Sequence, residues 1–171
     1  MEVAKVPLVL LSLISYVVAL IILVNLVYAS DNTIAIQTKG SSTAISIDQS
    51  GTSNTTTVWC GLSGGTYATH SCSNATMTID QHGTSNTARA YSQLTNHNDN
   101  VYTINQNGNS NNGYIDLDDD DNIASITQTG NSNTGIIYMR GDDNVYTITQ
   151  TGNSFYAKMY AFGDDSAWAI T

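Results

Sequence analysis

Residues Ile104-Asn105-Gln106-Asn107-Gly108 form one of five copies of a short motif, Ile-x-Gln-x-Gly, and these copies decide the fold. The glutamines of the five copies are Gln49, Gln81, Gln106, Gln128 and Gln150. The last three lie 22 residues apart, and the two earlier intervals are 32 and 25 residues. A motif that recurs at such a period indicates a repeat architecture, because a unit of this size must stack on its neighbours to bury its apolar side.

Apolar and polar residues alternate around each copy. In the last copy, Tyr146 and Ile148 lie on the same side of an extended chain as Gln150, and the opposite side carries threonine at 147, 149 and 151. Alternation with a period of two predicts a β-strand whose Ile and Gln side faces a core. The isoleucines at the same position in the five copies are Ile47, Ile79, Ile104, Ile126 and Ile148.

A turn and a second strand are expected after each motif. The motif glycines are Gly51, Gly83, Gly108, Gly130 and Gly152, and each is followed by Thr-Ser or Asn-Ser. Glycine permits positive φ, while Asn and Ser bond to nearby backbone, so these tripeptides predict tight turns. The second strand begins its buried side at Asn54, Asn86, Asn111 and Asn133. Its outer side carries an aromatic column of Trp59, Tyr91, Tyr138 and Tyr160, which Asp116 interrupts.

These features predict an all-β fold, a flat two-sheet β-solenoid of stacked strand-turn-strand repeats with about 22 residues per rung. Rungs stacked at about 4.8 Å would place every Gln over a Gln and every Asn over an Asn. A buried amide without a partner costs free energy, so each column is expected to form an amide-to-amide ladder. The Asn column should end at Phe155, which stands where the fifth Asn would be.

The chain divides into three predicted parts. Residues 1–29 resemble a secretory signal peptide, with Lys5 before an apolar run and Ala29 before the expected cleavage point. The rival interpretation is an uncleaved membrane anchor, because the run is long enough to span a bilayer. Residues 30–42 form an N-terminal segment, and residues 43–171 form the repeat domain. Residues 165–171 match the first strand of a sixth repeat, up to the position before its Gln, and such a half-rung invites a second chain to complete it.

Two cysteines lie within the extra residues that separate the first two motifs. In an oxidising, secretory context Cys60 and Cys72 are expected to form a disulfide that closes a loop insertion and contributes about 2–3 kcal/mol. Two free thiols are the alternative. The nearby His70 does not complete a convincing zinc site with them.

The excess of acidic side chains limits the kinds of partner that the chain is expected to bind. Residues 30–171 carry four basic and 13 acidic side chains, all of the latter Asp, so a nucleic-acid partner is not expected. The residues Asp120, Asp121, Asp142 and Asp143 would stack at one corner, which leaves open a calcium-dependent adhesin. The Gly-Gly-x-Gly-x-Asp calcium repeat is absent, and a solvated turn that limits aggregation explains the same residues.

Two other functions are weaker. An ice-binding solenoid would use an array of outward threonines, but only two repeats carry Thr-x-Thr. An enzyme would need a catalytic set, and His70, His82 and His97 each lie in a different context. We therefore expect no catalysis and no cofactor.

The repeats resemble those of the curlin family, the subunits of curli fibres. The segment Gln81-His-Gly83-Thr-Ser-Asn86-Thr-Ala88 matches the family pattern Gln-x-Gly-x-x-Asn-x-Ala in full, and the other four copies match it in part. The family's closing Gln is replaced in all five repeats, by Cys60, Ser92, Leu117, Met139 and Ala161. The resemblance implies export through a bacterial outer membrane by a dedicated secretion machinery. It also implies assembly with itself and with other curlin-like subunits into extracellular amyloid fibres that serve adhesion and biofilm. Membrane contact would be limited to the signal segment.

Overall fold

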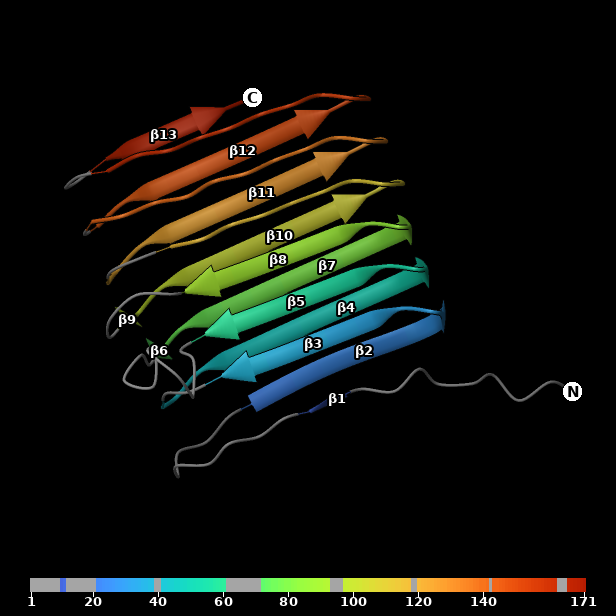
Figure 1. Cartoon of the computed structure of the whole chain (residues 1–171), viewed down its shortest axis with the longest axis horizontal. Coiled ribbons are helices and arrows are strands. Elements are labelled where there is room, and N and C mark those ends of the chain that lie inside the picture. The colour runs from blue at the N-terminus through green and yellow to red at the C-terminus, as the bar shows by residue number, and fades with distance from the viewer. Residues whose placement is uncertain are drawn as a thin grey trace, which may run out of the picture.

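The computed structural model describes residues 10–11, 21–38, 41–60, 72–92, 97–117, 120–141, 143–162 and 166–171. Over these residues the chain is all-β, and its parallel strands form two larger sheets, stacked in two layers, and one two-stranded sheet (Figure 1). The strands are β1 Leu10–Leu11, β2 Ile21–Ser30, β3 Thr33–Thr38, β4 Ala44–Thr52, β5 Thr55–Cys60, β6 Cys72–Ser73, β7 Thr76–Thr84, β8 Thr87–Ser92, β9 His97–Asn98, β10 Val101–Asn107, β11 Ile123–Thr129, β12 Val145–Thr151 and β13 Ala167–Ile170. Within these ranges the structure contains no helix that is long and apolar enough to cross a membrane.

The larger sheet is built from the motif strands. Its order is β13-β12-β11-β10-β7-β4-β2, and every neighbouring pair is parallel. The pairing places equivalent motif residues side by side, so that Gln81 lies between Gln49 and Gln106. The same register continues through Gln128 to Gln150, with the isoleucines aligned in parallel. Residues far apart in the sequence therefore become neighbours because their motifs are aligned.

The second sheet is built from the chain segments that follow each turn. Its strands β3, β5 and β8 pair in parallel, and the alignment continues through three return segments, 111–117, 133–139 and 155–161. The return segments are joined by single bridges rather than by full strands. Their backbone bonds are regular nonetheless, since the N–H groups of Gly113, Gly135 and Ala157 each donate over 2.9 Å to the preceding repeat.

The turn between the two sheets requires glycine at its first position. Gly108 has a φ of +129°, and a Cβ added there would lie 2.0 Å from the carbonyl oxygen of Gly130. The residue two positions later is Ser110, which also has positive φ, and so do its four equivalents. Because each turn lies directly on the next one, the conformation of one turn constrains all of them.

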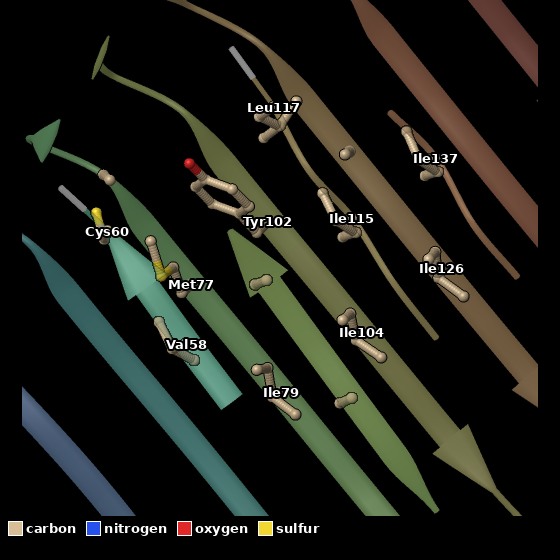
Figure 2. Packing of buried hydrophobic residues seen from close by; sticks show 14 of the residues in the cluster. Val58, Cys60, Met77, Ile79, Tyr102, Ile104, Ile115, Leu117, Ile126 and Ile137 are labelled. Atoms are coloured by element: carbon tan, nitrogen blue, oxygen red, sulfur yellow. The ribbon is translucent and has the colours of Figure 1, made fainter. Parts of the chain in front are cut away.

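The core lies between the two sheets. Tyr102 and the motif isoleucines Ile79, Ile104 and Ile126 project from the larger sheet toward Val58, Ile115 and Ile137 of the second sheet (Figure 2). Tyr146 and the other motif isoleucines are buried in the same core. Gly113 and Gly135 sit opposite Ile104 and Ile126, where an added Cβ would meet the isoleucine methyl at 3.1 and 2.9 Å. The alternation of the burial pattern along β10, β11 and β12 is the one expected from the sequence.

The aligned stack begins before residue 43, the predicted start of the repeat domain. Strand β3 pairs residue for residue with β5, and its Ile34 and Ile36 are buried. Strand β2, which lies within the predicted signal peptide except for its last residue, Ser30, pairs with β4. The structure thus shows the arrangement of the uncut chain, and cleavage before Ser30 stays a prediction.

Candidate functional site

A ladder of glutamine amides runs through the core. The side-chain N–H of Gln49 donates to Oε1 of Gln81 over 2.6 Å, and the equivalent steps to Gln106, Gln128 and Gln150 measure 2.8, 2.9 and 2.8 Å. Each step runs in the same direction along the chain. The amides also donate to backbone carbonyls of the opposite sheet, for example from Gln106 to Thr87 over 3.0 Å. The ladder therefore joins successive repeats and also ties the two sheets together.

All hydrogen bonds of the ladder run in the same direction, so its two ends differ. At the N-terminal end, Oε1 of Gln49 is buried and has no hydrogen-bond partner in the described part of the chain. At the other end, Gln150 accepts from Gln128 and donates to the carbonyl of Thr134 over 3.0 Å. A buried acceptor without a partner is costly, so the N-terminal end of the ladder is the less satisfied of the two.

The asparagine column bonds differently from the expected amide-to-amide ladder. The backbone N–H of Asn86 donates to Oδ1 of Asn54 over 2.9 Å, and Nδ2 of Asn86 donates to the carbonyl of Gly108 over 2.8 Å. Asn111 and Asn133 repeat this pattern. The side chain of Asn is one methylene shorter than that of Gln and lies at a turn, so it reaches main-chain groups instead. The column does end at Phe155, whose N–H donates to Oδ1 of Asn133 over 3.0 Å.

The structure adds residues that the sequence analysis did not place in a column. Asn32 precedes the Asn column, and its Oδ1 accepts from the N–H of Asn54 over 2.8 Å. The dipeptide Asn-Thr at 32–33, which recurs at 54–55 and 86–87, was the available signal. A second column, Asn100, Asn122 and Asn144, is fully buried at the opposite corner, with steps of 2.8 and 3.2 Å.

The outer aromatic column is continuous rather than interrupted at Asp116. Tyr114 fills the place, with its ring 5.4 Å from Tyr91 and 5.4 Å from Tyr138. Its hydroxyl donates to Asp116 over 3.0 Å, and burial together with this carboxylate raises the pKa of Tyr114. The other rings of the column, Trp59 against Tyr91 and Tyr138 against Tyr160, lie 4.7 and 4.5 Å apart.

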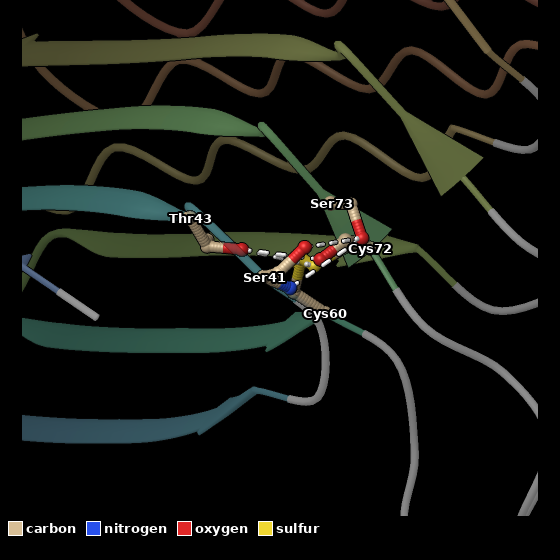
Figure 3. Close-up of a disulfide and its surroundings, with 5 residues drawn as sticks. All are labelled: Ser41, Thr43, Cys60, Cys72 and Ser73. Carbon is tan, nitrogen blue, oxygen red and sulfur yellow. Dashed lines mark hydrogen bonds between the residues drawn. A yellow bond between two sulfur atoms is a disulfide. The ribbon is translucent and has the colours of Figure 1, made fainter. Parts of the chain in front are cut away.

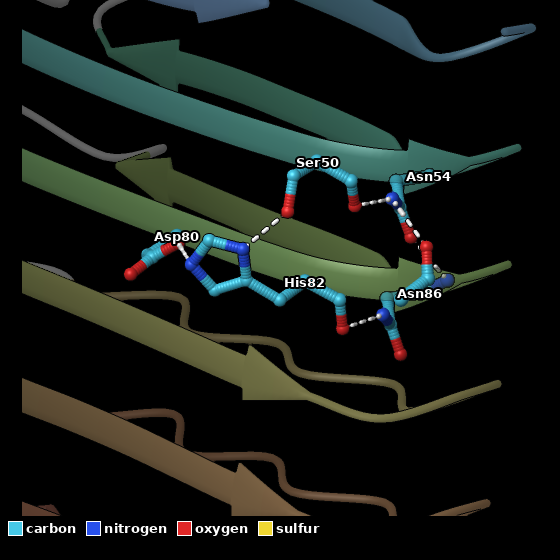
Figure 4. A network of polar contacts seen from close by, with 6 residues as sticks. Ser50, Asn54, Asp80, His82 and Asn86 are labelled. Atoms are coloured by element: carbon cyan, nitrogen blue, oxygen red, sulfur yellow. Dashed lines mark hydrogen bonds and ion pairs between the residues drawn. The ribbon is translucent and has the colours of Figure 1, made fainter. Parts of the chain in front are cut away.

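A contact between a serine, a histidine and an aspartate lies on the outer side of β4 and β7. Nε2 of His82 lies 2.7 Å from Asp80, and Nδ1 of His82 contacts the hydroxyl of Ser50 (Figure 4). The imidazole is 44% exposed on an open strand face. Burial and the neighbouring Asp48 raise the pKa of Asp80, while His82 partly opposes them. The contact joins two repeats across the face of the sheet.

The backbone conformation explains why Asp occurs at the aspartate corner, the turn positions that include Asp120, Asp121 and Asp143. Asp121 and Asp143 have φ of 56° and 51°, a left-handed conformation that Asp tolerates better than most residues. In the described parts of the chain, no three His, Cys, Asp or Glu side chains are grouped so that they could hold a metal ion. Asp120 is among the described residues, and Asp142 lies outside them.

Cys60 and Cys72 are joined by a disulfide at one corner of the stack (Figure 3). Their Cα atoms lie 5.6 Å apart, and both residues belong to the buried core. The hydroxyl of Thr43 donates to the carbonyl of Cys72 over 3.1 Å, which links the corner to the next strand. Residues 61–71 of the predicted loop insertion, including His70, lie outside the described residues.

Comparison with known proteins identifies one family. Residues 120–166 match the model of the curlin associated repeat. No curated protein and no solved structure matches the chain. The matched residues contain the fourth and fifth motif copies, and the resemblance to the curlin-repeat family is therefore confirmed over this segment.

Proposed function

We propose that the chain is a structural, non-catalytic subunit of an extracellular, curli-like amyloid fibre on a bacterial cell surface, where it serves adhesion and the biofilm matrix. The glutamine ladder is the observation that carries this proposal. Four consecutive steps have the same direction and lengths from 2.6 to 2.9 Å, so each repeat bonds to the next in the same way. Each further chain stacked in the same register would add four more steps of the same kind.

The proposed architecture is a β-solenoid with one repeat per rung. The parallel, in-register pairing of both sheets supports it. Such a stack has two ends, and each end presents the unpaired N–H and C=O groups of its last strands. Identical chains that share this register can bond through those edges, which is the geometry of cross-β fibres.

The proposed setting is the outside of the cell. The match to the curlin associated repeat, the Cys60–Cys72 disulfide and the predicted signal peptide each favour an oxidising, extracellular location. In this proposal the partners are further copies of the chain, other curlin-like subunits and the secretion machinery of the outer membrane.

The direct test uses protein exported and processed by a Gram-negative host. Thioflavin fluorescence should rise with time, and aligned fibres should diffract at about 4.8 Å along the axis and at about 10 Å across it. Protein that stays monomeric for days without binding dye would contradict the proposal.

A further inference from the structure

The two ends of the stack carry complementary halves of a repeat. At the C-terminal end, β13 extends the larger sheet beyond β12, while the second sheet stops at the return segment 155–161 in the described residues. At the N-terminal end, β3 belongs to the second sheet, and its counterpart in the larger sheet is β2, which lies within residues 1–30. Removal of the predicted signal peptide would leave β3 without that counterpart.

The exposed side chains at the C-terminal end have the orientation of core residues. Trp168 lies next to Tyr146 in the register, yet it is 61% exposed whereas Tyr146 is fully buried. The difference arises because, among the described residues, β13 is an edge strand and no strand lies opposite it, whereas β12 is paired on both sides. A hollow is present there instead, and Gln150, Phe155, Ala157 and Ile170 are among the residues that line it.

The N-terminal half-repeat has the matching shape. Ile34 and Ile36 point to the interior of the stack and are only 5% and 7% exposed in the uncut chain. In the complete repeats, the residue aligned with Ile34 faces the motif isoleucine, as Gly113 faces Ile104 at 3.1 Å. By the same register, Ile34 would face Ile170, and Ile36 would face the next inner residue, Trp168.

We propose that β3 of a second, processed copy docks on the return segment 155–161, opposite β13, so that two chains build one composite repeat. In this joint Ile34 of the second copy lies next to Ala157, and Ile36 lies next to Met159. The pattern of the sheet gives two backbone bonds, from the N–H of Ile34 to the carbonyl of Tyr156 and from the N–H of Tyr156 to the carbonyl of Asn32. The β4 strand of the second copy then pairs with β13.

This joint specifies the contact between subunits of the proposed fibre, and it rests on that proposed function and on cleavage before Ser30. It makes the assembly head-to-tail, because the two half-repeats differ and neither can pair with itself to complete a repeat. A head-to-tail contact that does not close into a ring produces an open filament.

Trp168 provides a test that separates the joint from fibre formation. The chain has two tryptophans, so Trp59→Phe leaves Trp168 as the only one, and Trp168→Phe leaves only the outward Trp59 as the matched control. On assembly, Trp168 emission should shift to the blue and its quenching by acrylamide should fall several-fold, whereas Trp59 should change little. Fibres in which Trp168 stays as accessible as in the monomer would overturn the joint and leave the proposed function standing. Absence of fibres would overturn both.

Cross-linking tests the register. Exported chains carrying Ala35→Cys are mixed with chains carrying Lys158→Cys, since these outward positions are aligned in the proposed joint and within the span of a disulfide. Mild oxidation of the fibres should yield a peptide linking positions 35 and 158 between copies, distinguishable by mass from the native Cys60–Cys72 peptide. Tyr156→Cys, two residues out of register on the same side, should link to position 35 far less. A disulfide between two copies of position 35, or equal cross-linking yields from the variants at positions 156 and 158, would overturn the composite repeat.

Discussion

The side-chain amide of Gln106 donates to Oε1 of Gln128 over 2.9 Å, although 22 residues separate them in the chain. The contact joins two repeats inside the core, where water cannot replace it. Replacing both residues with Ala should remove the hydrogen bond that Gln81 donates to Gln106 and the one that Gln150 accepts from Gln128, at about 1–3 kcal/mol for each buried group that loses its ladder partner. Fibre growth followed by thioflavin should slow strongly or stop.

Two outward threonines provide the control for this prediction. Thr127 lies on the outward side of β11 and Thr149 on the outward side of β12, and their replacement with Ser should change the growth rate little. Equal effects from the Gln pair and the Thr pair would contradict the inward assignment of the ladder.

Gly108 should tolerate no side chain. A Cβ there would lie 2.0 Å from the carbonyl oxygen of Gly130, and the left-handed backbone alone costs an L-residue about 1–2 kcal/mol. Gly108→Ala should therefore lower the urea midpoint of the soluble chain and slow assembly. Gly113→Ala is the matched control, because φ there is not positive and Ala88 already occupies the aligned position. A Gly113→Ala variant as damaged as Gly108→Ala would show that space in the core, not the turn, is the limiting factor.

The aspartate corner should oppose assembly. Like charges stacked in neighbouring repeats repel, and salt screens them, so the effect should be largest at low ionic strength. Changing Asp120, Asp121, Asp142 and Asp143 to Asn removes the charge and retains a side chain that tolerates positive φ. The fourfold variant should grow fibres faster, equally with calcium and with chelator.

A requirement for calcium in assembly or stability would contradict the charge-repulsion prediction. If the wild type assembles faster or becomes more stable only with calcium, and the fourfold variant loses that gain, the corner is a calcium site. The adhesin interpretation would then replace the charge-repulsion interpretation.

Asp80 should make stability depend on pH. Folding raises the pKa of Asp80, mainly through burial, so the folded chain binds this proton more tightly than the unfolded chain does. Stability should therefore rise as the pH falls from neutral through the raised pKa, and the gain should level off below the ordinary value of about 3.9. Asp80→Asn should be slightly more stable than wild type at pH 7, by a fraction of a kcal/mol because the site is partly exposed, and this advantage should vanish in acid.

Urea denaturation followed by circular dichroism at several pH values measures this dependence. Asp48→Asn removes the neighbouring charge that contributes to the shift, so it should reduce the pH dependence without abolishing it. An Asp80→Asn variant that is less stable at pH 7 would show that the contact with His82 outweighs the cost of burial.

The periodic residues made the fold predictable from the sequence, because alternation and motif spacing act along one strand at a time. The parallel alignment of Gln49 through Gln150 follows from those local signals. The hydrogen bonding of the Asn column could not be derived from those signals. It depends on how far the short Asn side chain reaches toward the carbonyl groups of the turn. Tyr114 also escaped prediction, because its ring reaches the aromatic column from two residues away.

Contacts between repeats of different sequence were the hardest to foresee. Ser50, Asp80 and His82 meet because β4 and β7 are paired in a particular register. No spacing of these residues in the sequence predicts their contact. The start of the stack at Asn32 could have been predicted, because the dipeptide Asn32-Thr33 recurs in later repeats. It was missed because this half-repeat lacks a motif glutamine.

The mass of fibre per unit length tests the central claim most directly. Without β2, each chain would contribute the six remaining strands of the larger sheet. At about 4.8 Å per strand, one chain should occupy about 29 Å of the fibre axis. Electron microscopy of unstained fibres should therefore give one chain per about 29 Å for each protofilament. A value near one chain per about 4.8 Å would mean that every chain lies flat in a single layer, and it would contradict the stacked-repeat account.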